Sequence, residues 1–330
     1  MVYFFLNYRS VKISAWAQTA MFIFLLTLGA ILAIVGYTRG SPDNFWPPFW
    51  PDKNPLACVL AFAIPAFTYL SGFEVVAMMA EEAKMPPRRI GLSSVLSLVF
   101  AGSFYVTVLL AAAWLIPWEY TATALERGTI EEFAVAGFPA LGVAAWCISI
   151  LGLLTSWLAL FMSASRVVLA LARAGMLPEA FRKIHPKYGT PTNALLLVLL
   201  VSLAIGWLGR SAIIWLLDVA GVLMALAWMI GVMSLLMLRR KFPHVERPFK
   251  VPAYRIICII SILFLLVEAV LALIPGSPIS LVWPYEYAIF GLWTLMGIIF
   301  YILTPRRLSD AEALKLLLGK ELYSKFFRET

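Results

Sequence analysis

Eight long apolar segments constrain the fold of this chain more than any other feature of its sequence. A helix rises about 1.5 Å per residue, so about 20 apolar residues cross the hydrocarbon core of a bilayer. The pattern predicts an all-α integral membrane protein with eight transmembrane helices and the lipid bilayer as its partner. The segments are Ala15–Tyr37, Pro55–Ala80, Ile90–Pro117, Pro139–Ala172, Pro191–Leu208, Ser211–Leu238, Ile256–Ile274 and Tyr287–Thr304, of which the fifth and the eighth are the shortest.

The composition excludes a soluble domain. Of the 330 residues, 62% are hydrophobic and 13% are charged, whereas soluble domains are about 25% charged. The net charge of +8 would suit nucleic acid, but the basic residues are divided among separate connectors, so we predict no nucleic-acid partner. Cys58, Cys147 and Cys258 lie in apolar segments without a C-x-x-C spacing, so neither a disulfide framework nor a metal site is predicted.

The chain lacks the sequence patterns of an enzyme that works inside a membrane. It contains no H-E-x-x-H and no G-x-S-x-G, and its two histidines, His185 and His244, lie in polar connectors. Those motifs supply the zinc ligands of a metalloprotease or the nucleophile of a hydrolase. We therefore predict that the chain is not an enzyme and needs no cofactor.

The distribution of basic residues predicts the orientation in the membrane, because cytoplasmic loops carry an excess of Lys and Arg. If the N-terminus is cytoplasmic and eight spans alternate, 22 of the 26 basic residues fall in cytoplasmic segments. The outer loops then hold only Arg39, Lys53, Arg127 and Arg210. We expect a multi-pass protein of the cell membrane with both termini in the cytoplasm.

The second apolar segment is interrupted in its middle by Tyr69-Leu70-Ser71-Gly72-Phe73-Glu74. Glycine costs about 1 kcal/mol relative to alanine inside a helix, and a carboxylate at mid-membrane costs at least about 2.5 kcal/mol. Both residues are expected where a spanning helix breaks and its freed backbone groups face a cavity, as in secondary transporters. The alternative is a glycine used only for close helix packing.

The predicted break suits a zwitterion or an organic cation. The half-helix that ends near Leu70 presents unpaired carbonyls, which suit an ammonium group. The half-helix that begins near Phe73 presents N–H groups, which suit a carboxylate or Glu74 itself. The residues predicted to bind the substrate are Phe67, Tyr69, Ser71, Gly72 and Phe73. Phe67 and Tyr69 could attract an ammonium group by a cation–π interaction, and packing alone remains open for both.

Three residues are candidates for coupling to H⁺ or to Na⁺, and the choice between these ions stays open. Glu74 is the only carboxylate beside the break, so it could carry a proton; the alternative role is an N-terminal cap of the second half-helix. Thr155 and Ser156 lie in the middle of the fourth segment, where hydroxyls could bind Na⁺. Hydroxyls in membrane helices more often bond their own backbone.

Two further carboxylates lie within the spans, and structural roles are expected for both. Asp218 is near the outer end of the sixth segment and Glu268 lies in the seventh. We expect Asp218 to reach polar atoms near the interface and Glu268 to make a hydrogen bond between helices.

Four stretches, taken in order, resemble the amino acid–polyamine–organocation (APC) superfamily of transporters. They are Asn7–Lys12 with Gln18; Gly72-Phe73-Glu74 with Glu81-Glu82, Pro86 and Arg88-Arg89; Ser165-Arg166 with Ala172–Pro178 and His185–Pro191; and Leu238–Lys241 with Pro243 and Arg247-Pro248-Phe249. They resemble the entry to the family's fifth helix, its sixth helix, its eighth-to-ninth connector and the segment after its tenth helix.

The resemblance implies a partial inverted-repeat transporter fold of the five-plus-five type, with a broken second span. Members have about twelve spans, and the eight spans of this chain match the fifth to the twelfth. We therefore expect a single transmembrane domain over residues 1–330, made of four parts. Residues 1–37 hold the last helix of the first repeat, 55–238 the second five-helix repeat, 239–304 two peripheral helices and 305–330 a cytoplasmic tail.

The function implied by the resemblance is secondary active transport of amino acids or related organic amines. The chain would then act as part of a permease that lacks its first four helices, one of which carries the other half of the substrate site in relatives. The alternative is a truncated fragment that does not transport, or a subunit that needs a partner chain carrying the missing four helices.

Overall fold

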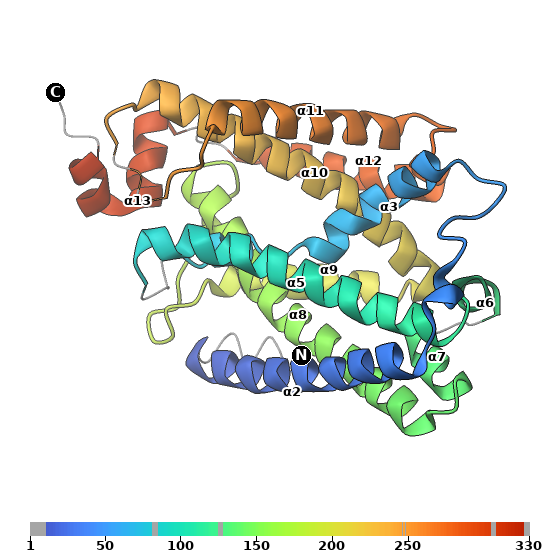
Figure 1. The fold of residues 1–330 in the computed structure, drawn as a ribbon. Coiled ribbons are helices and arrows are strands. Elements are labelled where there is room, and N and C mark those ends of the chain that lie inside the picture. The colour runs from blue at the N-terminus through green and yellow to red at the C-terminus, as the bar shows by residue number, and fades with distance from the viewer. Residues whose placement is uncertain are drawn as a thin grey trace. The chain divides into compact units, whose positions relative to one another are not determined.

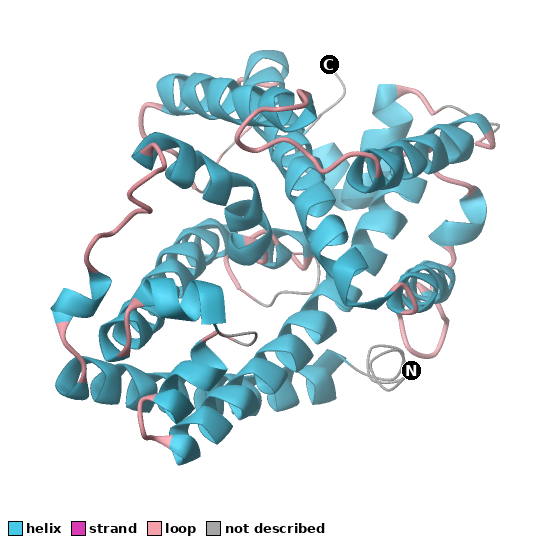
Figure 2. Cartoon of the chain, turned by 90° about the vertical axis from the view of Figure 1, so that its right-hand side faces the viewer, coloured by secondary structure: helices cyan, strands magenta, loops and turns pink. Residues whose placement is uncertain are grey.

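The computed structural model of this chain describes residues 11–80, 85–124, 128–245, 247, 249–304 and 308–326. Every regular element in these ranges is helical, and short loops connect the helices (Figures 1 and 2). The elements are α2 (Val11–Arg39), η1 (Pro42–Phe45), α3 (Pro55–Leu70), α4 (Val75–Met78), α5 (Pro87–Leu115), α6 (Trp118–Ala124), α7 (Thr129–Val135), α8 (Pro139–Arg173), η2 (Glu179–Arg182), α9 (Thr192–Gly206), α10 (Gly209–Lys241), α11 (Tyr254–Leu273), α12 (Tyr285–Ile302) and α13 (Asp310–Phe326).

Within the described ranges, 6 helices are long and apolar enough to cross a membrane. They match six of the predicted segments and extend over Gln18–Arg39, Arg88–Leu115, Pro139–Arg173, Ala212–Lys241, Tyr254–Leu273 and Tyr285–Ile302. The second predicted segment is divided into α3 and α4, and the fifth corresponds to the 15-residue helix α9. The class of all-α integral membrane protein is confirmed, while the count of eight spans stays a prediction.

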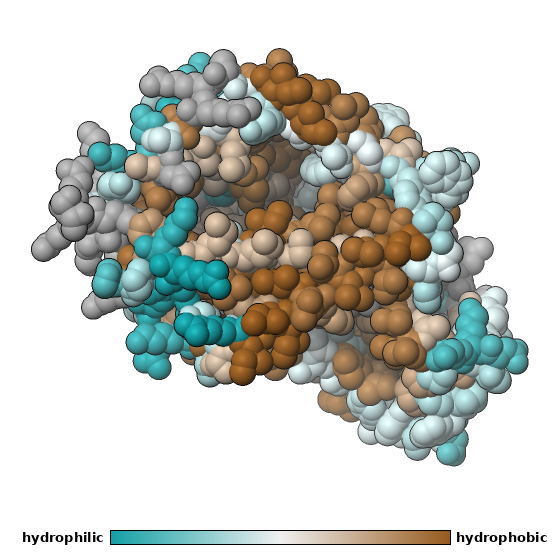
Figure 3. Space-filling view, turned by 90° about the horizontal axis from the view of Figure 1, so that it is seen from above, coloured by the Kyte–Doolittle hydropathy of each residue, from teal (hydrophilic) through white to brown (hydrophobic). Residues whose placement is uncertain are grey.

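Apolar side chains cover broad areas of the surface, as the brown regions of Figure 3 show. On α11, for example, Ile260, Leu263 and Val267 are each more than half exposed. Exposed apolar areas of this extent are unfavourable in water but match the hydrocarbon of a bilayer.

The chain packs as two compact units. The first consists of residues 1–55 and 93–162, and the second of residues 56–92 and 163–330. Helices α5 and α8 each pass from one unit to the other. We describe each unit by itself.

In the first unit, α2 lies directly against α5. Gly36 is so close to the backbone of Ala111 that a side chain at this position would clash. The hydroxyl of Tyr37 donates to the carbonyl of Thr107 over 2.9 Å, and the next turn continues the contact through the Ser41 N–H and the Trp114 carbonyl (2.8 Å). The buried residues of this unit's core are Leu32, Ala112, Phe133 and Ala145.

In the second unit, α10, α11 and α12 form the core, and α11 runs alongside α10 (Figure 1). Its buried side chains are Val219, Val222, Ala272, Ile279 and Leu281, and Leu60 of α3 packs against them. This contact places α3, the helix that leads into the predicted break, against the core of the second unit.

The polar connectors of the second unit are held by local hydrogen bonds. After α8, Gly175 adopts φ +75° and the Met176 N–H bonds back to the Leu171 carbonyl (2.9 Å), which ends the helix. After α10, Arg247 donates to the Phe242 carbonyl (2.7 Å) and so occupies one of the free acceptors at the helix end. At the start of α13, Ser309 and Glu312 bond to each other reciprocally in a capping box.

Candidate functional site

The predicted helix break is present between α3 and α4. Helix α3 ends at Leu70, Ser71–Glu74 form a turn, and α4 begins at Val75. The second helix thus starts two residues later than expected, because Phe73 and Glu74 still belong to the turn. The Ser71 hydroxyl donates to the Thr68 carbonyl over 2.8 Å and so covers one acceptor in the last turn of α3.

Gly72 is required at the break by its backbone conformation. Its φ of +119° is one that L side chains rarely adopt, and no heavy atom lies within 4 Å of the position a Cβ would take. Glycine adopts positive φ without a steric penalty. The alternative of a glycine used for close helix packing is therefore wrong for this residue.

The Glu74 carboxylate turns back into the break. Its Oε2 atom accepts the Gly72 N–H over 2.9 Å. Glu74 occupies the residue just before α4, but its side chain makes no capping hydrogen bond to that helix. The alternative role as a side-chain cap of the second half-helix is therefore not what the structure shows. The carboxylate instead satisfies an N–H group that the break itself leaves free.

Of the three aromatic residues predicted to bind the substrate, Phe67 and Phe73 pack against the same residue of α10, Trp228. The ring centroids of Phe67 and Phe73 each lie 5.2 Å from that of Trp228. Phe67 also contacts Phe264 of α11 at 6.5 Å. Tyr69 is 54% exposed. Packing therefore accounts for the positions of Phe67 and Phe73, while the ring of Tyr69 stays accessible.

Thr155 and Ser156 lie in the first unit, whereas the residues around the break lie in the second. The Thr155 hydroxyl donates to the Gly152 carbonyl of its own helix over 2.9 Å, which is the backbone bonding expected of a hydroxyl in a membrane helix. Ser156 is exposed. In the ranges the structure describes, no group of three or more His, Cys, Asp or Glu side chains could hold a metal ion.

The other two carboxylates within the spans are in the second unit. Glu268 is 4% exposed, and neither of its oxygens has a hydrogen-bond partner among the described residues. The expected hydrogen bond between helices is therefore wrong for Glu268. In the same unit, the Oε2 atom of the buried Glu286 on α12 accepts the Val282 N–H over 2.6 Å.

Sequence reasoning missed two residues beside the break, Thr68 and Trp228. The Thr68 hydroxyl donates to the Leu217 carbonyl of α10 over 3.0 Å. The indole of Trp228 touches the rings of Phe67 and Phe73, one before and one after Gly72. No local pattern marks either residue, because both contacts join segments that are far apart in the sequence.

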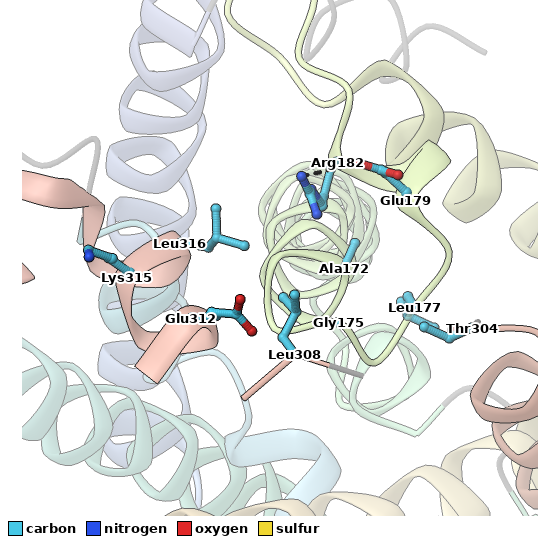
Figure 4. A pocket seen from close by; sticks show the side chains of 10 residues that line it. All are labelled: Ala172, Gly175, Leu177, Glu179, Arg182, Thr304, Leu308, Glu312, Lys315 and Leu316. Atoms are coloured by element: carbon cyan, nitrogen blue, oxygen red, sulfur yellow. Dashed lines mark ion pairs between the residues drawn. The ribbon is translucent and has the colours of Figure 1, made fainter. Parts of the chain in front are cut away.

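A cavity of about 410 Å³ lies elsewhere in the second unit, and Figure 4 shows its lining. The end of α8, η2, the residues after α12 and α13 surround it, and Arg182 pairs with Glu179 at one side (3.2 Å). Leu308 rests on Gly175 there. None of the predicted substrate residues lines this cavity, so it is separate from the break.

Comparison with known proteins agrees with the architecture. The family model described as amino acid permease matches residues 1–299. The methylthioribose transporter of Bacillus subtilis is 28% identical over 308 residues, which cover 91% of this chain and 62% of that protein. The branched-chain amino acid permease BcaP of Bacillus subtilis is 29% identical over 310 residues, with coverages of 92% and 62%. Human cationic amino acid transporter 4 is 26% identical over 182 residues, with coverages of 54% and 28%.

This chain thus spans about three-fifths of the length of the first two relatives. The matches confirm the resemblance to the APC superfamily, and they are matches to transporters, which agrees with the expectation that the chain is not an enzyme. Because the family model covers most of the chain and the described helices are those of a multi-pass membrane protein, the chain belongs to the amino acid permease family.

Proposed function

We propose that this chain takes part in secondary active transport of amino acids or related organic amines across the cell membrane, and that the Ser71–Glu74 break forms part of the substrate site. The observation that carries the proposal is a helix broken at a positive-φ glycine, in a chain of the amino acid permease family. Such breaks leave backbone groups free for a substrate at the middle of the membrane.

The chemistry around the break favours an ammonium group. Helix α3 ends at Leu70, so the negative end of its dipole and the carbonyls of its last turn point toward the break. Glu74 adds a carboxylate on the other side of Gly72. Tyr69 is exposed at the same helix end, and its ring is available for a cation–π contact. Of the five predicted substrate residues, Tyr69 and the backbone at Ser71 and Gly72 are the ones we assign to direct contact.

The relatives' names set the range of substrates to test. They specify branched-chain amino acids, cationic amino acids and methylthioribose, which share a small polar body and differ in side chain and charge. We propose an amino acid or an amine for this chain, because the carbonyl end of α3 and the Glu74 carboxylate both complement a positive charge.

We further propose eight spans, with α3 and α4 as the two parts of one broken span and α9 as a short fifth span. The charge asymmetry then places both termini in the cytoplasm. Glu74 is the residue we assign to coupling with H⁺. Thr155 and Ser156 are the candidates for Na⁺, and the bond of Thr155 to its own backbone weighs against that ion.

A second candidate function is a chain that transports only with a partner supplying further helices. The observation that favours it is the 62% coverage of the first two relatives. In this architecture a substrate site takes broken helices from both repeats, and the described part of this chain has one such break.

Uptake into liposomes tests both candidates. The purified 330-residue chain is reconstituted alone or with a co-expressed segment that carries the first four helices of a relative. The probes are a branched-chain amino acid, a cationic amino acid and methylthioribose, and liposomes without protein are the control. Uptake by the chain alone supports the first candidate. Uptake only in the co-reconstituted sample supports the second, and no uptake of any probe in either sample contradicts both.

A further inference from the structure

Helix α10 contacts the predicted substrate helix before Gly72, at Phe67 and Thr68, and after it, at Phe73. We propose that α10 positions the break and that Thr68 and Trp228 are the positioning residues through which it does so. The inference rests on the proposed function, in which the break forms part of the substrate site. It assigns a role to two residues that no sequence motif identifies.

Thr68 is bonded to α10 in an unusual way. Hydroxyls in membrane helices ordinarily donate to a carbonyl one turn earlier in the same helix. Among the described residues, Thr27, Thr38, Thr107 and Thr294 are examples of this bond. Thr68 instead donates to the Leu217 carbonyl of α10 over 3.0 Å. Its own carbonyl accepts the Ser71 hydroxyl over 2.8 Å, so one residue connects α10 to the first residue of the turn.

Trp228 contacts one aromatic ring before Gly72 and one after it. Its indole meets the ring of Phe67 at an interplanar angle of 71° and that of Phe73 at 51°, both with centroids 5.2 Å apart. Phe67 precedes the turn and Phe73 lies within it. Because a single rigid side chain touches both rings, it sets the separation of the two segments that flank Gly72. Tilted and edge-to-face aromatic pairs of this kind are attractive beyond the apolar area that they bury.

Gly72, within the turn, has open space beside it among the described residues. A Cβ at Gly72 would have no heavy atom within 4 Å, and the Gly72 N–H bonds within the turn to Glu74. The position of the turn therefore depends on the contacts at its ends. Those at Thr68 and Trp228 both go to α10, so a shift of α10 would carry the carbonyl end of α3 and the Phe73 ring with it.

Hydrogen exchange of the 330-residue chain in detergent micelles tests the role of Thr68 without any need for transport. Thr68→Val removes the hydroxyl at nearly constant volume, and Thr68→Ser is the matched control that keeps it. We expect amides of the break segment, residues 66–78, to exchange about fivefold faster in Thr68→Val, as for the loss of one hydrogen bond. Thr68→Ser should exchange within about twofold of the wild-type chain.

Trp228 is tested in the same way with its own control. Trp228→Leu should accelerate exchange on both sides of Gly72, whereas Trp228→Phe, which keeps an aromatic ring, should restore most of the protection. Trp207→Leu is the control for loss of an indole, because Trp207 is 90% exposed, and it should leave the break segment unchanged. Unchanged exchange of the break in both Thr68→Val and Trp228→Leu would overturn the proposal. An equal acceleration in α12 would overturn it as well, since it would indicate general destabilisation.

Transport by whichever reconstituted sample takes up substrate, the chain alone or the chain with the co-expressed segment, gives the functional counterpart. A displaced break weakens substrate binding, so Thr68→Val should raise KM several-fold with a smaller change in kcat, and Thr68→Ser should return KM to the wild-type value. A lower kcat at unchanged KM would contradict positioning. If the wild-type carrier itself moves no substrate, the proposed function fails, while the exchange measurement still decides whether α10 positions the break.

Discussion

Gly72→Ala is the sharpest test of the helix break, because the structure isolates a single cause for its effect. The φ of Gly72 is +119°, and the added methyl group would meet no heavy atom within 4 Å. Among the described residues, apart from its two chain neighbours, nothing would clash with the added methyl group, so the expected cost comes from the backbone conformation. A residue with a side chain held in such a region costs about 1–3 kcal/mol, so Gly72→Ala should lower the free energy of unfolding by about this amount.

Gly231→Ala is the matched control for this substitution. Gly231 lies inside α10, has no positive φ, and likewise has no heavy atom within 4 Å of its Cβ position. Alanine is favoured over glycine inside a helix by about 1 kcal/mol, so the same added methyl group should stabilise the protein. The two variants should therefore differ from each other by about 2–4 kcal/mol.

The measurement is a denaturant titration in detergent micelles, followed by tryptophan fluorescence, for the wild-type chain and both variants. We expect the midpoint of Gly72→Ala below, and that of Gly231→Ala above, the wild-type midpoint. A Gly72→Ala variant as stable as Gly231→Ala would refute the reasoning, because it would show that the backbone at the break accepts a side chain without strain.

Three further predictions concern topology, coupling and an unpaired carboxylate. A cysteine placed at Thr129 should be labelled by an impermeant reagent from outside and one at Lys183 should not, and the opposite labelling would contradict the eight-span orientation. Glu74→Gln in the reconstituted sample that takes up substrate should keep substrate binding but flatten the pH dependence of transport; an unaltered pH profile would end the assignment of Glu74 to coupling. Glu268→Leu should raise the free energy of unfolding by about 1–3 kcal/mol, because it removes a buried group without a hydrogen-bond partner, and a lower unfolding midpoint would show that the carboxylate has a partner or a role in the membrane.

The sequence alone determined the features of this protein that depend on local chemistry. The length of an apolar run decides whether a helix crosses a membrane, and six of the predicted segments are single long helices. The break appears where Ser71 and Gly72 stand, because only glycine adopts a positive φ without strain. The sequence also shows directly that the charged residues cluster in the connectors between apolar segments.

The tertiary structure alone decided how the groups around the break are used. The Glu74 carboxylate accepts the Gly72 N–H, Trp228 contacts both Phe67 and Phe73, and neither oxygen of Glu268 has a hydrogen-bond partner among the described residues. The second segment also ends as a 16-residue and a 4-residue helix, which no count of apolar residues predicts. The ring contacts of Trp228 join side chains that are more than a hundred residues apart in the sequence, whereas the bond between Glu74 and Gly72 spans two residues and depends on how the chain turns at the break. Helical periodicity specifies the faces of a helix, and only packing specifies the partners.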